Sequence, residues 1–207
     1  MSLAALRSIP VVPASRLGRS ASPAEWSLEG LAGRVVEVSG GAHPAPLTAA
    51  VLLVRDAQAR GEPVAWITSE ESAFYPPDAA EAGVDLDALA VVRAPGLREA
   101  LRAADHLLRS GAFGLVVLDL GDRRDLTLAA QTRLGGLAQE HGAALVCLTR
   151  KPDGAPSLGS LVSLRVGAGR RRLGPGRFAC RVEALKDKRR GPGWGKEVPC
   201  RAPDGLR

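Results

Sequence analysis

A glycine-rich turn near the start of the chain has the residue order of a place where phosphate chemistry could occur. Residues 40–48 read Gly-Gly-Ala-His-Pro-Ala-Pro-Leu-Thr and follow the apolar run 35–39. Such a turn holds a nucleotide when it supplies successive backbone N–H groups, a Lys for the β- and γ-phosphates and a Ser or Thr hydroxyl for Mg²⁺. Here Pro46 occupies the Lys position and Leu47 the hydroxyl position. Because Pro44 and Pro46 also lack an N–H group, we expect the chain neither to bind nor to hydrolyse ATP.

Two carboxylates beside other apolar runs complete the set of residues that a nucleotide site would use. Glu70 follows the run 64–69 and could activate water, and Asp119 lies in the run 115–120 and could hold Mg²⁺. Without a bound phosphate neither carboxylate has a reaction to serve, so we predict no catalytic residue and no cofactor. We assign to a vestigial nucleotide site the residues Gly40, Gly41, Pro46, Leu47, Glu70 and Asp119.

The histidines and cysteines do not have the spacing of a metal site. None of the three His stands in a His-x-x-x-His pair, and none of the three Cys stands in a Cys-x-x-Cys pair. The odd number of Cys argues against a disulfide framework and favours a reducing compartment. The most apolar helical run, 47–54, is far shorter than the roughly 18–20 residues of a membrane span. We therefore predict a cytoplasmic protein without a metal, a membrane segment or a signal peptide.

The elements that position these residues alternate between strands and helices. Several runs are continuously apolar, as is typical of parallel strands buried on both faces, and Leu97, Leu101, Ala104 and Leu108 form one apolar stripe of a helix. This alternation predicts an α/β fold with a mainly parallel twisted sheet flanked by helices. The expected strands are 34–39, 64–69, 89–93, 115–120, 144–149, 161–166 and 178–185, and the expected helices are 47–60, 97–108 and 126–141.

The end of the chain has a different composition from its body. The last two expected strands flank a Gly- and Arg-rich segment, 167–177, which predicts an antiparallel hairpin with a long turn. Pro, Gly and small polar residues gather at both termini. The expected organisation is an extended N-terminal arm at 1–28, a core domain at 29–188 and a basic, flexible tail at 189–207.

Positive charge is concentrated in the C-terminal fifth. Residues 165–207 hold 13 Lys and Arg against 4 Asp and Glu, whereas the whole chain has a net charge of +6. This imbalance predicts an anionic partner, either nucleic acid or an acidic protein surface. Aromatic residues make up only 3% of the chain, which argues against a base-stacking platform. The candidate contacts with nucleic acid or a protein partner are Arg170, Arg171, Arg172, Lys186, Lys188, Arg189, Arg190 and Trp194.

Five segments, in order along the chain, resemble motifs of the RecA family. Glu70 stands at the place of that family's catalytic glutamate and Asp119 at that of its magnesium-side aspartate. Lys186-Asp187-Lys188 resembles the Lys-Asn-Lys element that reaches the nucleotide of a neighbouring filament subunit. The resemblance implies a RecA-like fold over almost the whole chain, with an arm at 1–28 that docks on RecA. The five segments are 30–40, 64–70, 82–89, 107–119 and 186–188.

Departures from the RecA pattern make the chain similar to the ImuA proteins, which are RecA-like accessory factors of SOS-induced mutagenic DNA synthesis. The nucleotide turn has lost its Lys and Ser/Thr, the regions of the DNA-contacting loops are short, and 186–193 reads Lys-Asp-Lys-Arg-Arg-Gly-Pro-Gly. The resemblance implies a non-catalytic adaptor of translesion synthesis. Its implied partners are an ImuB-like inactive Y-family polymerase protein, RecA and an error-prone replicative-type polymerase.

Two other functions remain open. A sequence-independent DNA-binding module would use the same basic residues to contact phosphates. A SulA-like cell-division inhibitor would also be a RecA relative without a nucleotide loop, but those proteins are generally shorter and lack the basic end seen here. An ATPase is a distant third reading, because the turn supplies neither the phosphate lysine nor the metal ligand.

Overall fold

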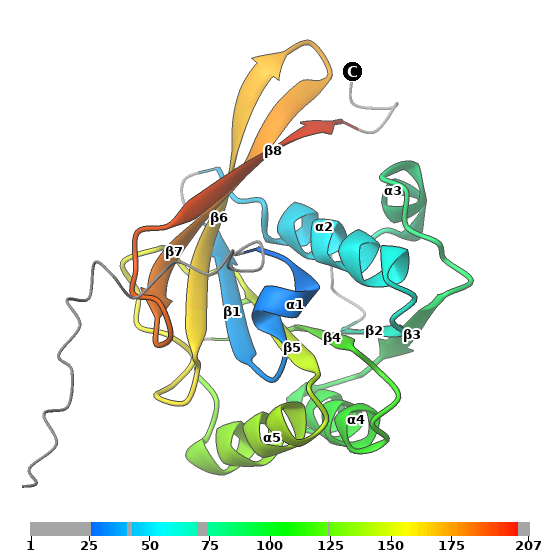
Figure 1. Ribbon diagram of the computed structural model, residues 1–207, viewed down its shortest axis with the longest axis vertical. Coiled ribbons are helices and arrows are strands. Elements are labelled where there is room, and N and C mark those ends of the chain that lie inside the picture. Colours follow the sequence, from blue (N-terminus) through cyan, green and yellow to red (C-terminus); the bar gives the residue numbers. More distant parts are fainter. Residues whose placement is uncertain (1–25, 41–42, 70–73, 124, 203–207) are drawn as a thin grey trace, which may run out of the picture.

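The apolar runs form the strands of one mixed β-sheet (Figure 1). The computed structural model describes residues 26–40, 43–69, 74–123 and 125–202, and among these the sheet has eight strands in the order β3-β2-β4-β5-β1-β6-β7-β8. Neighbouring strands from β3 to β6 are parallel, and the β6–β7 and β7–β8 pairs are antiparallel. The strands are β1 Val35–Gly40, β2 Val64–Thr68, β3 Leu89–Arg93, β4 Leu115–Asp119, β5 Ala144–Thr149, β6 Leu164–Gly174, β7 Arg177–Asp187 and β8 Gly195–Arg201.

Helices cover both faces of the sheet and enclose two apolar cores (Figure 1). One core contains residues of α1, α2 and α3, and the other contains residues of α4 and α5. In α4 the side chains of Ala100, Ala104 and Leu108 are buried at four-residue intervals, as expected of an amphipathic helix. The helices are α1 Leu28–Leu31, α2 Pro46–Ala59, α3 Pro76–Glu81, α4 Leu97–Arg109 and α5 Leu128–Glu140.

The predicted fold class is confirmed. The strands β1, β2 and β5 are buried at every position, which explains why their sequences are apolar without alternation. The elements α1, α3 and β8 were not predicted, since each is short or carries a weak hydrophobic pattern. Within the described residues, no helix is both long and apolar enough to cross a membrane.

The prediction of a long turn in the hairpin is wrong. β6 and β7 continue through most of 167–177, and only Pro175 and Gly176 separate them. Gly residues inside a strand often mark a close approach rather than a turn. A Cβ atom on Gly167 would lie 2.9 Å from Asp153 Oδ1. The Gly- and Arg-rich composition that predicted a turn therefore belongs mostly to a strand, which its neighbours pack closely.

The expected flexible tail is also corrected. Residues 195–201 form β8, which pairs with β7 and is one edge of the sheet. Val198 and Cys200 are half-buried, whereas Glu197 and Pro199, which alternate with them, are exposed. Pro199 is tolerated because an edge strand has backbone groups that face no further strand.

The core begins three residues before its predicted boundary at 29. Trp26 is only 3% exposed and belongs to the core that α2 covers. Ser27 caps α1, because its hydroxyl accepts a hydrogen bond from the N–H of Gly30 at 3.2 Å. The rest of the predicted arm, 1–25, lies outside the described residues.

Candidate functional site

The turn after β1 is hydrogen-bonded to β6. The N–H of Ala45 donates to the carbonyl of Ala168 at 3.0 Å, and the N–H of Arg170 donates to the carbonyl of His43 at 2.9 Å. A backbone donor that is bonded to a neighbouring strand is not available to a phosphate group. The described part of the turn therefore acts as a short strand segment beside β6.

The residues at the predicted vestigial positions serve packing. A Cβ atom on Gly40 would lie 2.4 Å from the Cβ of Pro44, so only glycine fits at the end of β1. Pro46 is the first residue of α2, where its missing N–H costs no helical hydrogen bond. Leu47 is partly buried and packs against the core beneath α2.

Asp119 has a local structural contact. Its Oδ1 accepts a hydrogen bond from the N–H of Gly121 at 3.1 Å, and Gly121 adopts a φ of +54°. This contact stabilises the turn that follows β4. The other two predicted members of the nucleotide site, Gly41 and Glu70, lie outside the described residues.

The predicted basic residues form two clusters at opposite ends of the β6–β7 hairpin. In the register of this pair, Arg172 lies opposite Phe178 near the tip, and Arg165 lies opposite Lys186 near the base. At a rise of roughly 3.3 Å per residue, the clusters are about 20 Å apart. The tip cluster consists of Arg170, Arg171 and Arg172, and the base cluster of Lys186, Lys188, Arg189 and Arg190.

The arginines of the tip cluster divide between the two faces of the hairpin because side chains alternate along a strand. Arg171 forms an ion pair with Glu197 of β8. Arg170 and Arg172 instead line a hollow of about 430 Å³ together with His43. The structure thus brings the turn after β1 and the hairpin tip into one site, which the sequence did not predict.

The lysines of the base cluster are held by the segment 150–163. Lys186 Nζ donates to Ser157 Oγ at 3.3 Å, and Lys188 Nζ donates to the carbonyl of Ser160 at 2.6 Å. The pKa of Lys186 is lowered below its ordinary value, mainly because the side chain is partly buried and to a smaller extent because Lys188 repels its charge. The two arginines after Lys188 are exposed in the turn that leaves β7.

Comparison with known sequences places these features in a family. The sequence model of the RecA N-terminal domain matches residues 25–138, which is more than half of the chain. The chain belongs to the RecA N-terminal domain family. The RecA proteins of Nocardioides sp. (strain ATCC BAA-499 / JS614) and Kineococcus radiotolerans are 44% and 42% identical to it over 87 residues. These residues are 42% of this chain and 25% of each relative, so the similarity spans about a quarter of the RecA proteins matched. The strands β5 to β8 lie outside the family match.

This RecA-family chain contains a buried ionic cluster that the sequence analysis missed. Glu37 of β1 is fully buried, and its Oε1 lies 2.7 Å from Lys151 Nζ and 3.8 Å from Arg165 Nε. Its Oε2 accepts a hydrogen bond from the N–H of Leu158 at 2.7 Å. The cluster fixes the segment between β5 and β6 over the end of the sheet. A charged residue inside the apolar run 35–39 was the available signal.

A second buried pair closes the base of the hairpin in this RecA-family domain. Arg34 Nη2 lies 2.6 Å from Asp187 Oδ1, and Trp194 Nε1 donates to Asp187 Oδ2 at 3.0 Å. Burial opposes ionisation of Asp187, but hydrogen bonds from the N–H of Arg189, from Arg34 and from Trp194 outweigh it and lower the pKa of the carboxyl. Trp194, a predicted partner contact, thus also has a structural role within the chain.

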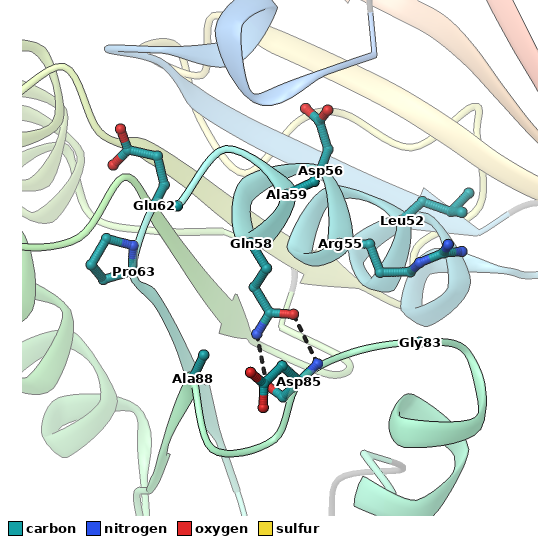
Figure 2. A pocket seen from close by; sticks show the side chains of 11 residues that line it. Leu52, Arg55, Asp56, Gln58, Ala59, Glu62, Pro63, Gly83, Asp85 and Ala88 are labelled. Carbon is teal, nitrogen blue, oxygen red and sulfur yellow. Dashed lines mark hydrogen bonds between the residues drawn. The ribbon is translucent and has the colours of Figure 1, made fainter.

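A larger hollow, of about 770 Å³, is lined by α2, by the loop that follows it and by the loop before β3; Figure 2 shows its lining residues. The side chain of Gln58 crosses it, with Nε2 donating to the carbonyl of Asp85 at 2.7 Å and Oε1 accepting from the N–H of Asp85 at 3.0 Å. The lining contains one basic residue, Arg55, and the acidic residues Asp56, Glu62 and Asp85. The mixed charge of these walls does not select one class of ion, and the Gln58 bonds attach the loop before β3 to α2.

Proposed function

We propose that this RecA-family protein is a non-catalytic accessory protein of SOS-induced mutagenic translesion DNA synthesis. It acts as an adaptor that binds an ImuB-like inactive Y-family polymerase protein and RecA, with an error-prone replicative-type polymerase as a further member of the assembly. Family membership supports the relation to RecA, and the order of the RecA-like motifs, with the nucleotide turn altered, supports the adaptor role.

The observation that carries the proposal is the state of the nucleotide turn. The N–H of Ala45 is bonded to β6, and Pro46 and Leu47 stand where a nucleotide site needs a Lys and a hydroxyl. Phosphoryl transfer depends on positioning and on charge stabilisation by these groups. A domain with this turn is better suited to binding partners than to turning over a nucleotide.

We assign the polymerase-like partner to the base of the hairpin. Arg189 and Arg190 are exposed, and Trp194 lies half-buried nearby with its N–H directed to Asp187. Arg and Trp are the side chains most enriched among the residues that dominate the energy of protein interfaces. A rigid Trp beside exposed arginines supports an interface with an acidic partner surface.

Co-purification tests this assignment. The tagged chain should recover the ImuB-like protein and RecA from DNA-damaged cells, identified by mass spectrometry. A Trp194→Ala variant should bind the polymerase-like protein about thirtyfold more weakly, corresponding to a loss of about 2 kcal/mol, and should recover correspondingly less of it. Arg181→Ala is the matched control, because Arg181 is exposed and its ion pair with Glu183 lies within β7. Recovery of neither protein by the wild-type chain would contradict the adaptor role.

A sequence-independent DNA-binding module is the second candidate. It is favoured by a specific observation: Arg170 and Arg172 share a hollow with His43, and no Asp or Glu among the described residues lines that hollow. Phosphate contacts of this kind supply affinity without reading sequence. An adaptor can also bind DNA, so the two candidates are tested separately.

A further inference from the structure

We propose that the hollow at the tip of the β6–β7 hairpin holds a nucleotide of single-stranded nucleic acid. The phosphate lies among Arg170, Arg172 and Arg177, and the base lies against Phe178. This inference goes beyond the adaptor role and deepens the DNA-binding candidate, since it names the site and the form of nucleic acid.

The position of the hollow makes it accessible to a long polymer. It measures about 430 Å³, within the usual range of ligand sites. Figure 1 shows the hairpin tip projecting beyond the helical layers, with the end of β8 beside it. Ala202, the last described residue after β8, contributes to the lining. A strand of nucleic acid can therefore enter and leave the site without passing through the body of the domain.

The charge of the hollow is not neutralised by the described residues. Arg170, Arg172 and Arg177 form no ion pair within the parts of the chain that the structure describes, and their side chains are exposed. On the same three strands, Arg171 pairs with Glu197 and Arg181 pairs with Glu183. The acidic residues of this sheet edge thus pair with arginines outside the hollow, and a phosphate is the partner that fits those inside it.

Phe178 gives the hollow an aromatic wall. It lies opposite Arg172 in the β6–β7 register and opposite Cys200 in the β7–β8 register. Its side chain is half-buried, because it packs against the core beneath α2 and also lines the hollow. Because the core holds this ring on one side, the ring is a fixed surface on which a base can stack.

The combination of a ring and arginines favours a single strand over a duplex. In a duplex the bases are stacked on one another, so their faces are not available to a protein side chain. Stacking on Phe178 requires an unpaired base, whereas the arginines contact the backbone of either form. His43 also lines the hollow, and it is attached to β6 by the bond from Arg170 N–H to its carbonyl.

A charge-matched pair of variants tests the site. The first is Arg170→Ala/Arg172→Ala/Arg177→Ala in the hollow, and the second is Lys188→Ala/Arg189→Ala/Arg190→Ala at the base of the same hairpin. Each lowers the net charge from +6 to +3. Binding of fluorescent oligothymidylate is measured by anisotropy between about 50 and 200 mM salt, and thermal unfolding checks that both variants are folded.

We expect the hollow variant to bind at least tenfold more weakly and to lose about two units of the log–log salt slope, since single strands lose roughly 0.7 unit per phosphate contact. The base variant should keep most of the affinity. Equal losses in the two variants, with both folded, would overturn the hollow as the site and leave DNA binding intact. If the wild-type chain did not bind oligothymidylate, both the site in the hollow and the DNA-binding candidate would be overturned. The adaptor role would not be affected, because it is tested by the recovery of protein partners.

Phe178→Leu tests the aromatic wall. We expect about tenfold weaker binding of oligothymidylate and little change with an abasic strand of equal length, which has the phosphates but no bases. A loss of the same size with both strands would overturn stacking on Phe178. A duplex of equal length should bind more weakly than the single strand, and tighter binding of the duplex would overturn the assignment to single-stranded nucleic acid.

Discussion

The carboxylate of Glu37 and the ammonium group of Lys151 lie 2.7 Å apart, and both side chains are buried. The hydroxyl of Thr149 donates to the same Oε1 at 3.2 Å, and Lys151 Nζ also donates to the carbonyl of Pro156 at 2.8 Å. The pair is thus surrounded by hydrogen bonds, which a buried ion pair needs to offset the loss of water. It joins β1 to the segment that lies between β5 and β6.

Removing one member of this pair should destabilise the protein strongly. In Lys151→Met the carboxylate of Glu37 stays buried without its ammonium partner, and we expect the free energy of unfolding to fall by about 3–5 kcal/mol. Glu37→Gln keeps the shape and an acceptor but leaves Lys151 and Arg165 buried without a carboxylate, so it should also be destabilising. Urea unfolding of both variants measures this, and a change below about 0.5 kcal/mol in Lys151→Met would contradict a structural role for the pair.

The Arg34–Asp187 pair should make stability depend on pH in the acid range. Burial opposes ionisation, yet the hydrogen bonds from Arg189 N–H, Arg34 and Trp194 hold the pKa of Asp187 below its ordinary value of 3.8. A lowered carboxyl pKa stabilises the folded state above the unfolded pKa, and this stabilisation is lost as the pH falls through the folded value. Asp187→Asn should cost about 2–4 kcal/mol near pH 7, and its difference from the wild type should shrink below about pH 4. Urea unfolding at several pH values tests this, and a difference that grew on acidification would contradict it.

Trp194 should contribute to both stability and partner binding, and two substitutions separate these contributions. Trp194→Phe removes the hydrogen bond to Asp187 but keeps an aromatic ring, so we expect a loss of about 1 kcal/mol in the free energy of unfolding. Trp194→Ala should reduce recovery of the polymerase-like partner more than Trp194→Phe does. Reversal of charge at Arg189 and Arg190 would set like charges against the acidic partner surface, so it should also weaken that recovery. We expect Trp194→Ala to weaken it more, and the opposite order of effects would place the partner mainly on the arginines.

Addition of Mg-ATP should leave the melting temperature unchanged. A ligand at millimolar concentration with micromolar affinity would add roughly 4 kcal/mol of stability. The double substitution Pro46→Lys/Leu47→Thr should not restore binding, because Ala45 N–H remains bonded to Ala168. Thermal unfolding with and without Mg-ATP tests both statements, and an upward shift of the wild type that Asp119→Ala abolishes would contradict them.

The strands β1, β2 and β5 could be predicted closely because they are buried on both faces. The apolar run 144–149 coincides with β5, and the stripe that includes Ala104 and Leu108 coincides with α4. The run 89–93 also coincides with β3, although β3 is an edge strand in which only Leu89 is buried. Burial of this kind determines the sequence of every residue in the strand. The local hydrophobic pattern was therefore sufficient to predict these elements.

The antiparallel half was harder to predict because pairing at a sheet edge requires few buried side chains. β8 buries none of its residues fully, so its sequence resembles that of a loop. The hollow at the hairpin tip joins His43 to Arg177, which are far apart in the chain. The bonds between the turn and β6, together with the pairing of β6 with β7, bring them together. Likewise, the glutamate of β1 and the lysine after β5 meet because β1 and β5 are neighbours in the sheet.

The proline in β8 has a consequence for how the molecule behaves at high concentration. An open sheet edge can recruit a strand from a second copy of the chain, and such recruitment leads to aggregation. Pro199 removes one donor from this edge, and Lys196, Glu197 and Arg201 are exposed charges along the same strand. If β8 of a second copy paired in register with this β8, the hydrogen bond at Pro199 could not form. Like charges of the two strands would also lie opposite one another. Among the described residues the sheet thus ends at β8 without a covering helix, and the proline and the charges of this strand oppose edge-to-edge joining of two copies.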